Sequence, residues 1–333
     1  MYRYKIEITP SNDVSLLVPL IKASSQAPYR FLAHEMQDEL NRFWFDSIVE
    51  LVQTKNTLVI SAFDQDSLVA CLIYSDNPWE SNVLGIKAGV INHLIIKDNY
   101  PFGRQVVGEM LDSLFQWALS GGIQFLVCKP YTDSIEVIQA CEQKGFILVD
   151  TLIDCIYDYR QFPLRETNPP KIPKEVTLRL AASSDLDELI NLAGASFQAH
   201  FGRYHSDELI GRDSATRIYQ EWTRSSLKGY ADWICVAEIG DRIAGFSIWK
   251  KPSSLEQRLS VRVGHYSIAG IHPDFFGRGL FTTLTYEGLK LLDGVADVVE
   301  GPTHINNYGV QLGYSKLHWR VCCDARHSFH KWL

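Results

Sequence analysis

The sequence predicts an α/β (α+β) protein with two similar domains in tandem, each a β-sheet flanked by helices. Its 333 residues are long for one domain and comfortable for two. A proline-rich segment, residues 163–174, divides the chain into halves of similar length. Parts of the same plan recur in both halves: a strand hairpin, a strand, an amphipathic helix, a strand and a last helix. We therefore expect domains at 1–162 and 175–333, joined by the 163–174 linker.

The second half gives the clearer pattern. Residues 176–180 alternate as a strand, and Ser183-Ser184-Asp185 then caps an amphipathic helix. Residues 212–227 carry apolar side chains at helical spacing. A turn at Gly240-Asp241 predicts a hairpin. The expected order continues as a strand up to residue 271, a helix after 279, a strand near 296–301, a helix over 307–316 and a strand from 319.

The first half repeats much of this order. Two apolar runs, 57–62 and 67–74, flank Asp64-Gln65-Asp66 and predict another hairpin. The following elements are expected as a strand at 90–96, a helix at 106–119, a strand at 124–128 and a helix from 135 to 146.

Composition excludes several classes of function. A net charge of −7 without a basic stripe argues against a nucleic-acid partner. No stretch approaches the about 18 apolar residues that span a bilayer, and the first six residues contain no signal segment. No His/Cys cluster has metal-ligand spacing. Four of the seven cysteines lie in or beside apolar runs and predict buried thiols: Cys71, Cys128, Cys155 and Cys235. We expect a cytoplasmic protein without a metal, a membrane or nucleic acid as partner.

Two blocks near the end of the chain carry the chemistry. Residues 268–281, IAGIHPDFFGRGLF, form an apolar run, a proline turn, a G-x-G pair and the start of a helix. This order leaves backbone N–H groups unpaired, and the glycines let a phosphate approach them. The second block is residues 303–319, THINNYGVQLGYSKLHW. Together the blocks resemble the GNAT superfamily of acetyl-CoA-dependent N-acetyltransferases.

The resemblance rests on individual positions. The matching residues are Ile271, Pro273, Gly277, Gly279, Asn307, Tyr314, Lys316 and Trp319. Three residues depart from the family pattern: Phe276 for Arg or Gln, Phe281 for a small residue, and His318 for glycine. The resemblance implies a mixed, mostly antiparallel sheet in each domain and acetyl-CoA as cosubstrate. The residues expected to bind acetyl-CoA are Ile268, Ala269, Gly270, Ile271, Phe276, Gly277, Arg278, Gly279, Leu280, Phe281 and Asn307.

The resemblance also implies catalytic roles. Tyr314 is expected to be the general acid toward the departing thiolate, with a core tyrosine as the alternative. Asn307 is equally interpretable as a helix N-cap. The candidates for the base are His304, which we place beside Tyr314 in the site, His272, the pair His200 and His205 with Tyr204, and a water relay. The residues expected to meet the acceptor, although aromatics at helical spacing are more often core, are Phe201, Tyr204, His205, Tyr219 and Trp222.

The first half resembles the same fold without its site. No G-x-G pair follows its strand at 90–96, and Ala140 or Cys141 stands where the second half has Tyr314. We expect a degenerate GNAT-like domain that does not bind CoA productively. An unrelated α/β domain is the alternative.

Several segments are similar to the dTDP-fucosamine acetyltransferase group: residues 79–86, 144–150, 192–197 and 329–333. This resemblance implies direct acetyl transfer, in a ternary complex, to the primary amine of a nucleotide-linked amino sugar. The expected partner is thus a small-molecule amine acceptor. The sequence leaves open whether the chain forms a homodimer. The alternatives are an acetyltransferase for another small-molecule or protein amine, and a non-catalytic module that binds CoA or a partner.

Overall fold

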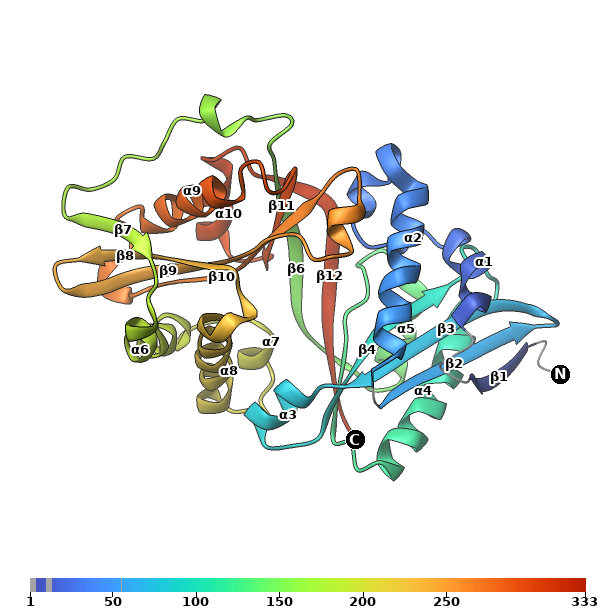
Figure 1. The fold of residues 1–333 in the computed structure, drawn as a ribbon. Helices are drawn as coiled ribbons and strands as arrows, with labels where there is room; N and C mark the ends of the chain where they lie inside the picture. The colour runs from blue at the N-terminus through green and yellow to red at the C-terminus, as the bar shows by residue number, and fades with distance from the viewer. Residues whose placement is uncertain (1–3, 10–13, 55) are drawn as a thin grey trace. The chain divides into compact units, whose positions relative to one another are not determined.

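The computed structural model describes residues 4–9, 14–54 and 56–333 (Figure 1). The first three residues of the N-terminal segment considered above lie outside this range. The chain forms two compact units: unit 1 consists of residues 1–151 and 324–333, and unit 2 of residues 152–323. Within the described ranges, no helix is both long enough and apolar enough to cross a membrane.

Unit 1 contains a sheet with the strand order β1-β2-β3-β4-β5-β12. Neighbouring strands are antiparallel except β4 and β5, which are parallel. Its elements are β1 (Tyr4–Thr9), α1 (Leu17–Lys22), α2 (Ala33–Val52), β2 (Thr57–Asp64), β3 (Ser67–Asp76), α3 (Pro78–Leu84), β4 (Ala88–Ile96), α4 (Gly103–Ser120), β5 (Phe125–Cys128), α5 (Ile135–Gln143), the start of β6 (Ile147–Asp158) and the end of β12 (Arg320–Trp332).

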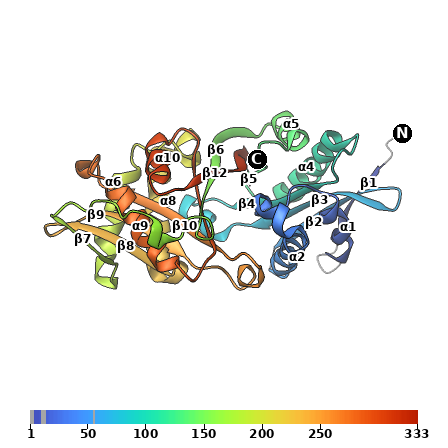
Figure 2. The same ribbon diagram turned by 90° about the horizontal axis from the view of Figure 1, so that it is seen from above.

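Helices cover both faces of this sheet. Figure 2 shows α4 and α5 on one face and α1 and α2 on the other. In β2, Leu58 and Ile60 pack into the cluster that contains α4, whereas Val59 packs with α1 and α2. Successive strand residues point to opposite faces, so a strand that is buried on both sides is apolar throughout. This explains the continuous apolar runs at 57–62 and 67–74, and the hairpin that they predict is confirmed.

Unit 2 contains a sheet with the strand order β6-β11-β10-β9-β8-β7. Here β10 and β11 are the parallel pair, and the other neighbours are antiparallel. Its elements, besides the end of β6 and the start of β12, are β7 (Val176–Leu180), α6 (Leu186–Phe197), α7 (Arg203–Ser206), α8 (Arg212–Ser225), β8 (Trp233–Ile239), β9 (Arg242–Lys250), β10 (Val263–Ile271), α9 (Leu280–Leu292), β11 (Val298–His304) and α10 (Tyr308–Ser315).

The core of unit 2 is built around a tryptophan. Trp249 is fully buried and stacks on Tyr266 at a centroid distance of 4.1 Å. Gly288 in α9 makes room for it, because a Cβ there would lie 1.8 Å from the indole. Figure 1 shows α9 and α10 on one face of this sheet and α6, α7 and α8 on the other. The predicted class, two mixed and mostly antiparallel sheets flanked by helices, is confirmed.

Unit 1 is discontinuous in the sequence, because its last strand follows unit 2. Residues 152–158 of β6, which follow unit 1 in the chain, pair with β11 of unit 2. Residues 329–332 of β12, which follow unit 2, pair with β5 of unit 1. The domain boundaries at 162 and 175 stay a prediction.

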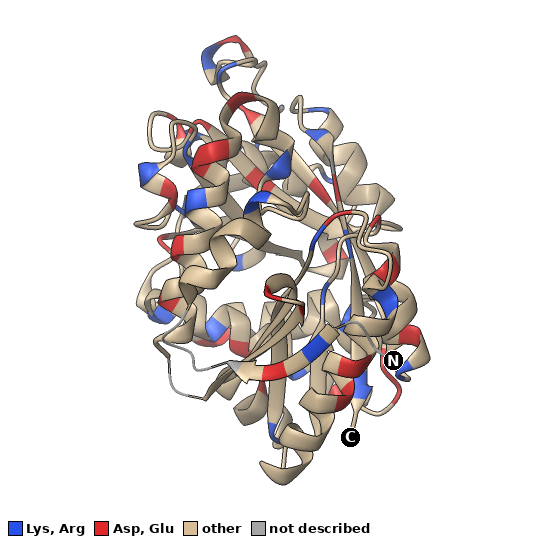
Figure 3. Cartoon of the chain, turned by 90° about the vertical axis from the view of Figure 1, so that its right-hand side faces the viewer, with Lys and Arg blue, Asp and Glu red and all other residues tan. Residues whose placement is uncertain are grey.

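Charges and thiols follow the composition. Figure 3 shows lysines and arginines interspersed with aspartates and glutamates along the helices and loops. Cys71, Cys128, Cys155 and Cys235 are buried free thiols, which confirms their predicted environment.

Candidate functional site

A splayed pair of parallel strands in unit 2 forms the framework of the site. β10 and β11 pair only at residues 263–265 and 298–300, although β10 continues to Ile271 and β11 to His304. Along the rest of β10, including the predicted acetyl-CoA segment 268–271, no pairing with β11 is present, and the carbonyl of Ile271 accepts a hydrogen bond from the Oγ of Ser196 at 3.0 Å. The pairing of β10 with β9 contains a bulge between Tyr266 and Ile268, which changes the direction of the backbone where the splay begins.

The loop after β10 has an open backbone. Gly277 and Gly279 adopt φ angles of +78° and +76°, which favour glycine. Apart from the chain neighbours, no atom lies within 4 Å of where a Cβ would be at either position. Among the described residues, the N–H groups of Gly277, Arg278 and Gly279 have no hydrogen-bond partner. Since α9 begins at Leu280, these donors and the helix dipole together favour an anion here.

The side chains of this loop have separate roles. Arg278 lies 3.8 Å from the carboxylate of Glu175, and Phe276 is 63% exposed. The side chain of Leu280 is buried in the core, so only its backbone can face a ligand. Phe281 packs against α10 at Gly313, where a Cβ would lie 2.5 Å from the ring. A bulky residue in α9 is thus matched by a glycine in α10, which gives the unusual Phe281 a packing role.

Tyr314 lies at the apex of the splay, the point where β10 and β11 diverge. Its ring stacks on Trp319 at 4.4 Å, and a Cβ on Gly301 would be 2.6 Å from its hydroxyl oxygen. Gly301 is the first residue of β11 beyond the pairing with β10. Burial raises the pKa of Tyr314 well above its usual value, and Tyr266 and Cys155 raise it further. The hydroxyl is therefore protonated at neutral pH, and burial makes it a weaker acid than an exposed tyrosine.

Histidine and aromatic rings from distant parts of unit 2 meet in one cluster. His200 lies 5.9 Å from His205, and His205 stacks on Tyr219 at 5.6 Å, all as centroid distances. Phe201 contacts His304, from the end of β11, at 4.7 Å. Four of the predicted residues, Phe201, His205, Tyr219 and His304, are thus brought together around His200.

Protonation differs among these histidines. The Nδ1 of His304 accepts a hydrogen bond from the N–H of Asn306 at 3.0 Å, so the neutral ring carries its proton on Nε2. Burial, with His205 and His304 adding to it, lowers the pKa of His200 to about 4. Burial and then Arg212 lower the pKa of His205, and both of its ring nitrogens are buried without a hydrogen-bond partner among the described residues. His304 is thus a donor, whereas His205 has an unused acceptor nitrogen.

The remaining candidates have other surroundings. Tyr204 is buried under the guanidinium of Arg203 and lies edge-on to Tyr219, at a centroid distance of 6.3 Å. The indole N–H of Trp222 is buried and has no hydrogen-bond partner in the described chain. The Nδ1 of His272 accepts a hydrogen bond from the N–H of Asp274, so this nitrogen holds the backbone of the loop after β10.

Asn307 caps α10. Its side-chain oxygen accepts from the N–H of Val310 at 3.4 Å. This is the N-cap arrangement that the sequence left open beside a contact with CoA.

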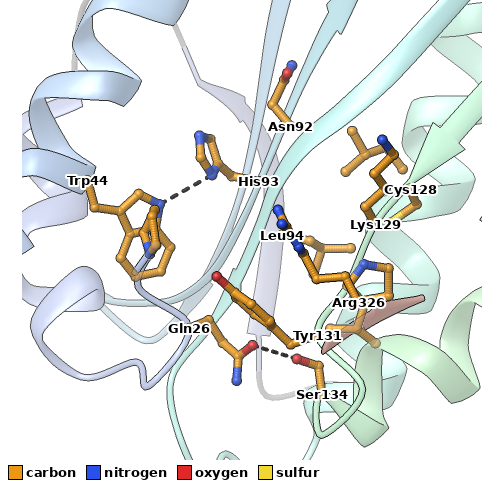
Figure 4. A pocket seen from close by; sticks show the side chains of 14 residues that line it. Gln26, Trp44, Asn92, His93, Leu94, Cys128, Lys129, Tyr131, Ser134 and Arg326 are labelled. Atoms are coloured by element: carbon orange, nitrogen blue, oxygen red, sulfur yellow. Dashed lines mark hydrogen bonds between the residues drawn. The ribbon is translucent and has the colours of Figure 1, made fainter. Parts of the chain in front are cut away.

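Unit 1 contains a second splay with a cavity that sequence reasoning missed. β4 and β5 pair only at residues 88–91 and 125–128, and β4 has a bulge at Asn92. A cavity of about 190 Å³ opens there, and all of its lining residues belong to unit 1 (Figure 4). They lie between positions 26 and 326 of the sequence, so no local motif predicts the cavity.

The two splays differ where unit 2 has its tyrosine. In unit 1, Cys141 of α5 contacts Cys128 at the end of β5. The hydrogen bond from this contact and then burial raise the pKa of Cys128, so the thiol is neutral. Unit 1 thus lacks the buried phenol of unit 2.

Comparisons with known proteins agree with this architecture. No family model matches the chain. A structure titled GCN5-related N-acetyltransferase from Sphaerobacter thermophilus is 13% identical, with a TM-score of 0.66 over 100% of this chain and 96% of that one. A tandem GNAT protein from the clavulanic acid biosynthesis pathway is 11% identical, with a TM-score of 0.58 over 99% of this chain and 98% of that one. The fold is that of tandem GNAT proteins.

One curated relative is also similar in sequence. The spore coat polysaccharide biosynthesis protein SpsD of Bacillus subtilis (strain 168) is 25% identical over 193 residues, which are 56% of this chain. The match spans about 60% of the length of that relative.

Proposed function

We propose that this chain is an acetyl-CoA-dependent N-acetyltransferase whose site lies in unit 2. The observation that carries the proposal is the row of three unpartnered N–H groups at Gly277, Arg278 and Gly279, beside the splayed strands. Consecutive amides before a helix suit a diphosphate, and the open glycines leave room for one. Acetyl-CoA carries such a diphosphate, and it supplies an activated acetyl thioester.

The residues of the splay then have defined tasks. The segment of β10 that does not pair with β11, residues 268–271, hydrogen bonds an extended ligand arm through its backbone. A backbone N–H at the bulge polarises a carbonyl oxygen in the manner of an oxyanion hole. Tyr314 holds the proton that a departing thiolate requires, because its hydroxyl is protonated and lies at the apex.

The histidine cluster receives the acceptor. His205 accepts the proton of the amine, because burial lowers the pKa of its ring and both of its nitrogens are buried without a hydrogen-bond partner among the described residues. His304 remains in the catalytic group as a hydrogen-bond donor through Nε2. Phe201 is exposed and offers its ring to the acceptor, whereas the buried Tyr219 stacks on Phe197 and His205. Tyr204 in α7 and Trp222 in α8 support this cluster.

The acceptor that we propose is a nucleotide-linked amino sugar, handled in the cytoplasm. The likeness to a spore coat polysaccharide protein and the aromatic cluster support this class. Aromatic rings with neutral polar groups are suited to a sugar and a base. Another small-molecule or protein amine is the second candidate acceptor.

Binding and turnover test the proposal separately. Acetyl-CoA at a hundredfold excess over its Kd should stabilise the protein by about 2.7 kcal/mol, visible as a rise in Tm. CoA release is then measured against nucleotide-linked amino sugars, polyamines and amino acids. Absence of both stabilisation and CoA release would refute the enzyme; stabilisation without release by any acceptor would favour a CoA-binding module.

A further inference from the structure

We propose that the cavity in unit 1 is a second ligand site, which binds a small molecule through a carboxylate or phosphate group and does not bind CoA. Its key residues are Trp44 of α2, His93 of β4, Lys129 and Tyr131 after β5, Ser134 before α5, and Arg326 of β12 (Figure 4). This inference goes beyond the proposed acetyl transfer, which is assigned to unit 2.

The chemistry of the lining favours an anion. Two cationic side chains, Lys129 and Arg326, line the cavity, and no aspartate or glutamate does. Trp44 and Tyr131 supply aromatic walls for the remainder of the ligand. Guanidinium and ammonium groups bind carboxylates and phosphates through charge-assisted hydrogen bonds.

His93 adds a neutral donor to this set. The indole N–H of Trp44 donates to its Nδ1 at 3.2 Å, so the neutral imidazole carries its proton on Nε2. Burial lowers the pKa of His93 to about 4, which keeps the ring neutral at pH 7. A donor that is fixed in this tautomer suits an oxygen acceptor.

The wall that carries Arg326 is held in place by Arg30. The Nε of Arg30 is 2.7 Å from the carboxylate of Asp324, which lies in β12 together with Arg326. The Nη1 of Arg30 is 2.8 Å from the carboxylate of Asp133, in the loop before α5. The guanidinium also lies 4.1 Å above the ring of Tyr131. Arg30 thereby offsets part of the negative charge of these two carboxylates and joins three segments of the cavity wall.

The loop of unit 1 that corresponds to the glycine loop is poorly suited to a diphosphate, because most of its backbone N–H groups are already hydrogen bonded. The N–H groups of Lys97, Asp98, Tyr100 and Gly103 all donate to backbone carbonyls, at 2.9 to 3.2 Å. The adjoining cavity of about 270 Å³ is lined by the carboxylates of Asp98, Asp133 and Glu136 as well as by Lys97. Because these N–H groups are already hydrogen bonded and carboxylates line the adjoining cavity, the diphosphate of CoA is disfavoured here. The ligand of unit 1 is therefore confined to the cavity that Lys129 and Arg326 line.

The test is a calorimetric titration of the whole chain with inorganic phosphate and with acetate, at constant ionic strength. Saturating CoA is present so that the loop of unit 2 is occupied. We expect saturable binding of one anion per chain, and the anion that binds identifies the group. R326Q and K129Q should each weaken it about ten- to a hundredfold, as the loss of one charge-assisted hydrogen bond implies. R104Q, which removes an exposed cation of α4 outside the cavity, should not change it.

Several outcomes overturn the proposal. These are no saturable binding of either anion, unchanged affinity in both cavity variants, or equal weakening in R104Q. A stoichiometry of two CoA molecules per chain would show that unit 1 accepts CoA after all. An unchanged far-UV circular dichroism spectrum of each variant confirms its fold; if R326Q fails to fold, K129Q decides, because Lys129 lies in a loop. If no CoA binds at all, the proposed function fails, whereas the anion titration of wild type and variants still tests this site.

Discussion

Replacing Gly301 by alanine tests whether the position of the Tyr314 hydroxyl matters. The added Cβ would lie 2.6 Å from that oxygen and 2.9 Å from the ring of Trp319, whereas ordinary contacts begin at 3.4 Å. The hydroxyl must therefore retreat by 0.8 Å, or β11 must move. Overpacking of this kind costs about 1–3 kcal/mol of stability. A displacement of this size at a reacting group lowers kcat by about a hundredfold.

The assay combines a thermal melt with the rate of CoA release. Gly309→Ala is the matched control, because a Cβ at this α10 position meets no atom within 4 Å and alanine favours a helix. We expect Gly309→Ala to keep its kcat and to melt slightly higher. A Gly301→Ala protein with unchanged Tm would refute the packing argument. An unchanged kcat despite a lower Tm would refute the catalytic role of the Tyr314 position.

The remaining predictions concern three residues of unit 2. Tyr314→Phe should lower kcat by about 10²- to 10⁴-fold and leave the Kd for acetyl-CoA unchanged; unchanged turnover would remove it from the acid role. Gly279→Ala should destabilise the chain by about 1–2 kcal/mol, because φ is +76°, and should weaken acetyl-CoA binding in a thermal-shift titration. His265 lies between Glu256 and Glu300, at 2.9 and 3.0 Å; burial lowers its pKa, but these carboxylates raise it to about 10. Because this pKa exceeds the unfolded value of about 6.5, its stabilisation is complete below that pH and is lost as pH rises toward about 10. His265→Gln should therefore remove a pH-dependent difference on the order of a few kcal/mol from the free energy of unfolding, measured by urea denaturation between about pH 6 and 10.

Local sequence signals predicted the framework of unit 2 well. The G-x-G pair predicted an open backbone, and no atom beyond the chain neighbours lies within 4 Å of where a Cβ would be at Gly277 or Gly279. The hairpin around Gly240 and the helix after Asp185 appear where turn and cap residues placed them. These features depend on neighbours in the chain, so residue type and spacing suffice to predict them.

Features that depend on distant contacts could not be predicted. Phe281 departs from the family pattern, and its partner Gly313 lies in another helix. Sequence reasoning named His200 and His205 as a pair, but not that Phe201 would bring His304 to them. Whether these residues catalyse the reaction stays a prediction.

The first half shows the same limit more strongly. The absence of a glycine loop after 90–96 led us to expect a domain without productive CoA binding, and nothing in the sequence indicated a cavity there. The residues that line it are separated by up to 300 positions, from Gln26 to Arg326. A cationic side chain in a late strand has no sequence signal that connects it to an early helix.

The discontinuity of unit 1 in the sequence has a consequence for how the protein is made. During synthesis, unit 1 emerges first, but the β12 residues that complete its sheet and supply Arg326 are translated only after all of unit 2. The closing of unit 1 must therefore wait for about 170 intervening residues, a contact of very long sequence separation, and such contacts form late in folding. A nascent chain thus has an unpaired edge at β5 until synthesis reaches β12, and the ligand site that we propose in unit 1 is complete only from that moment.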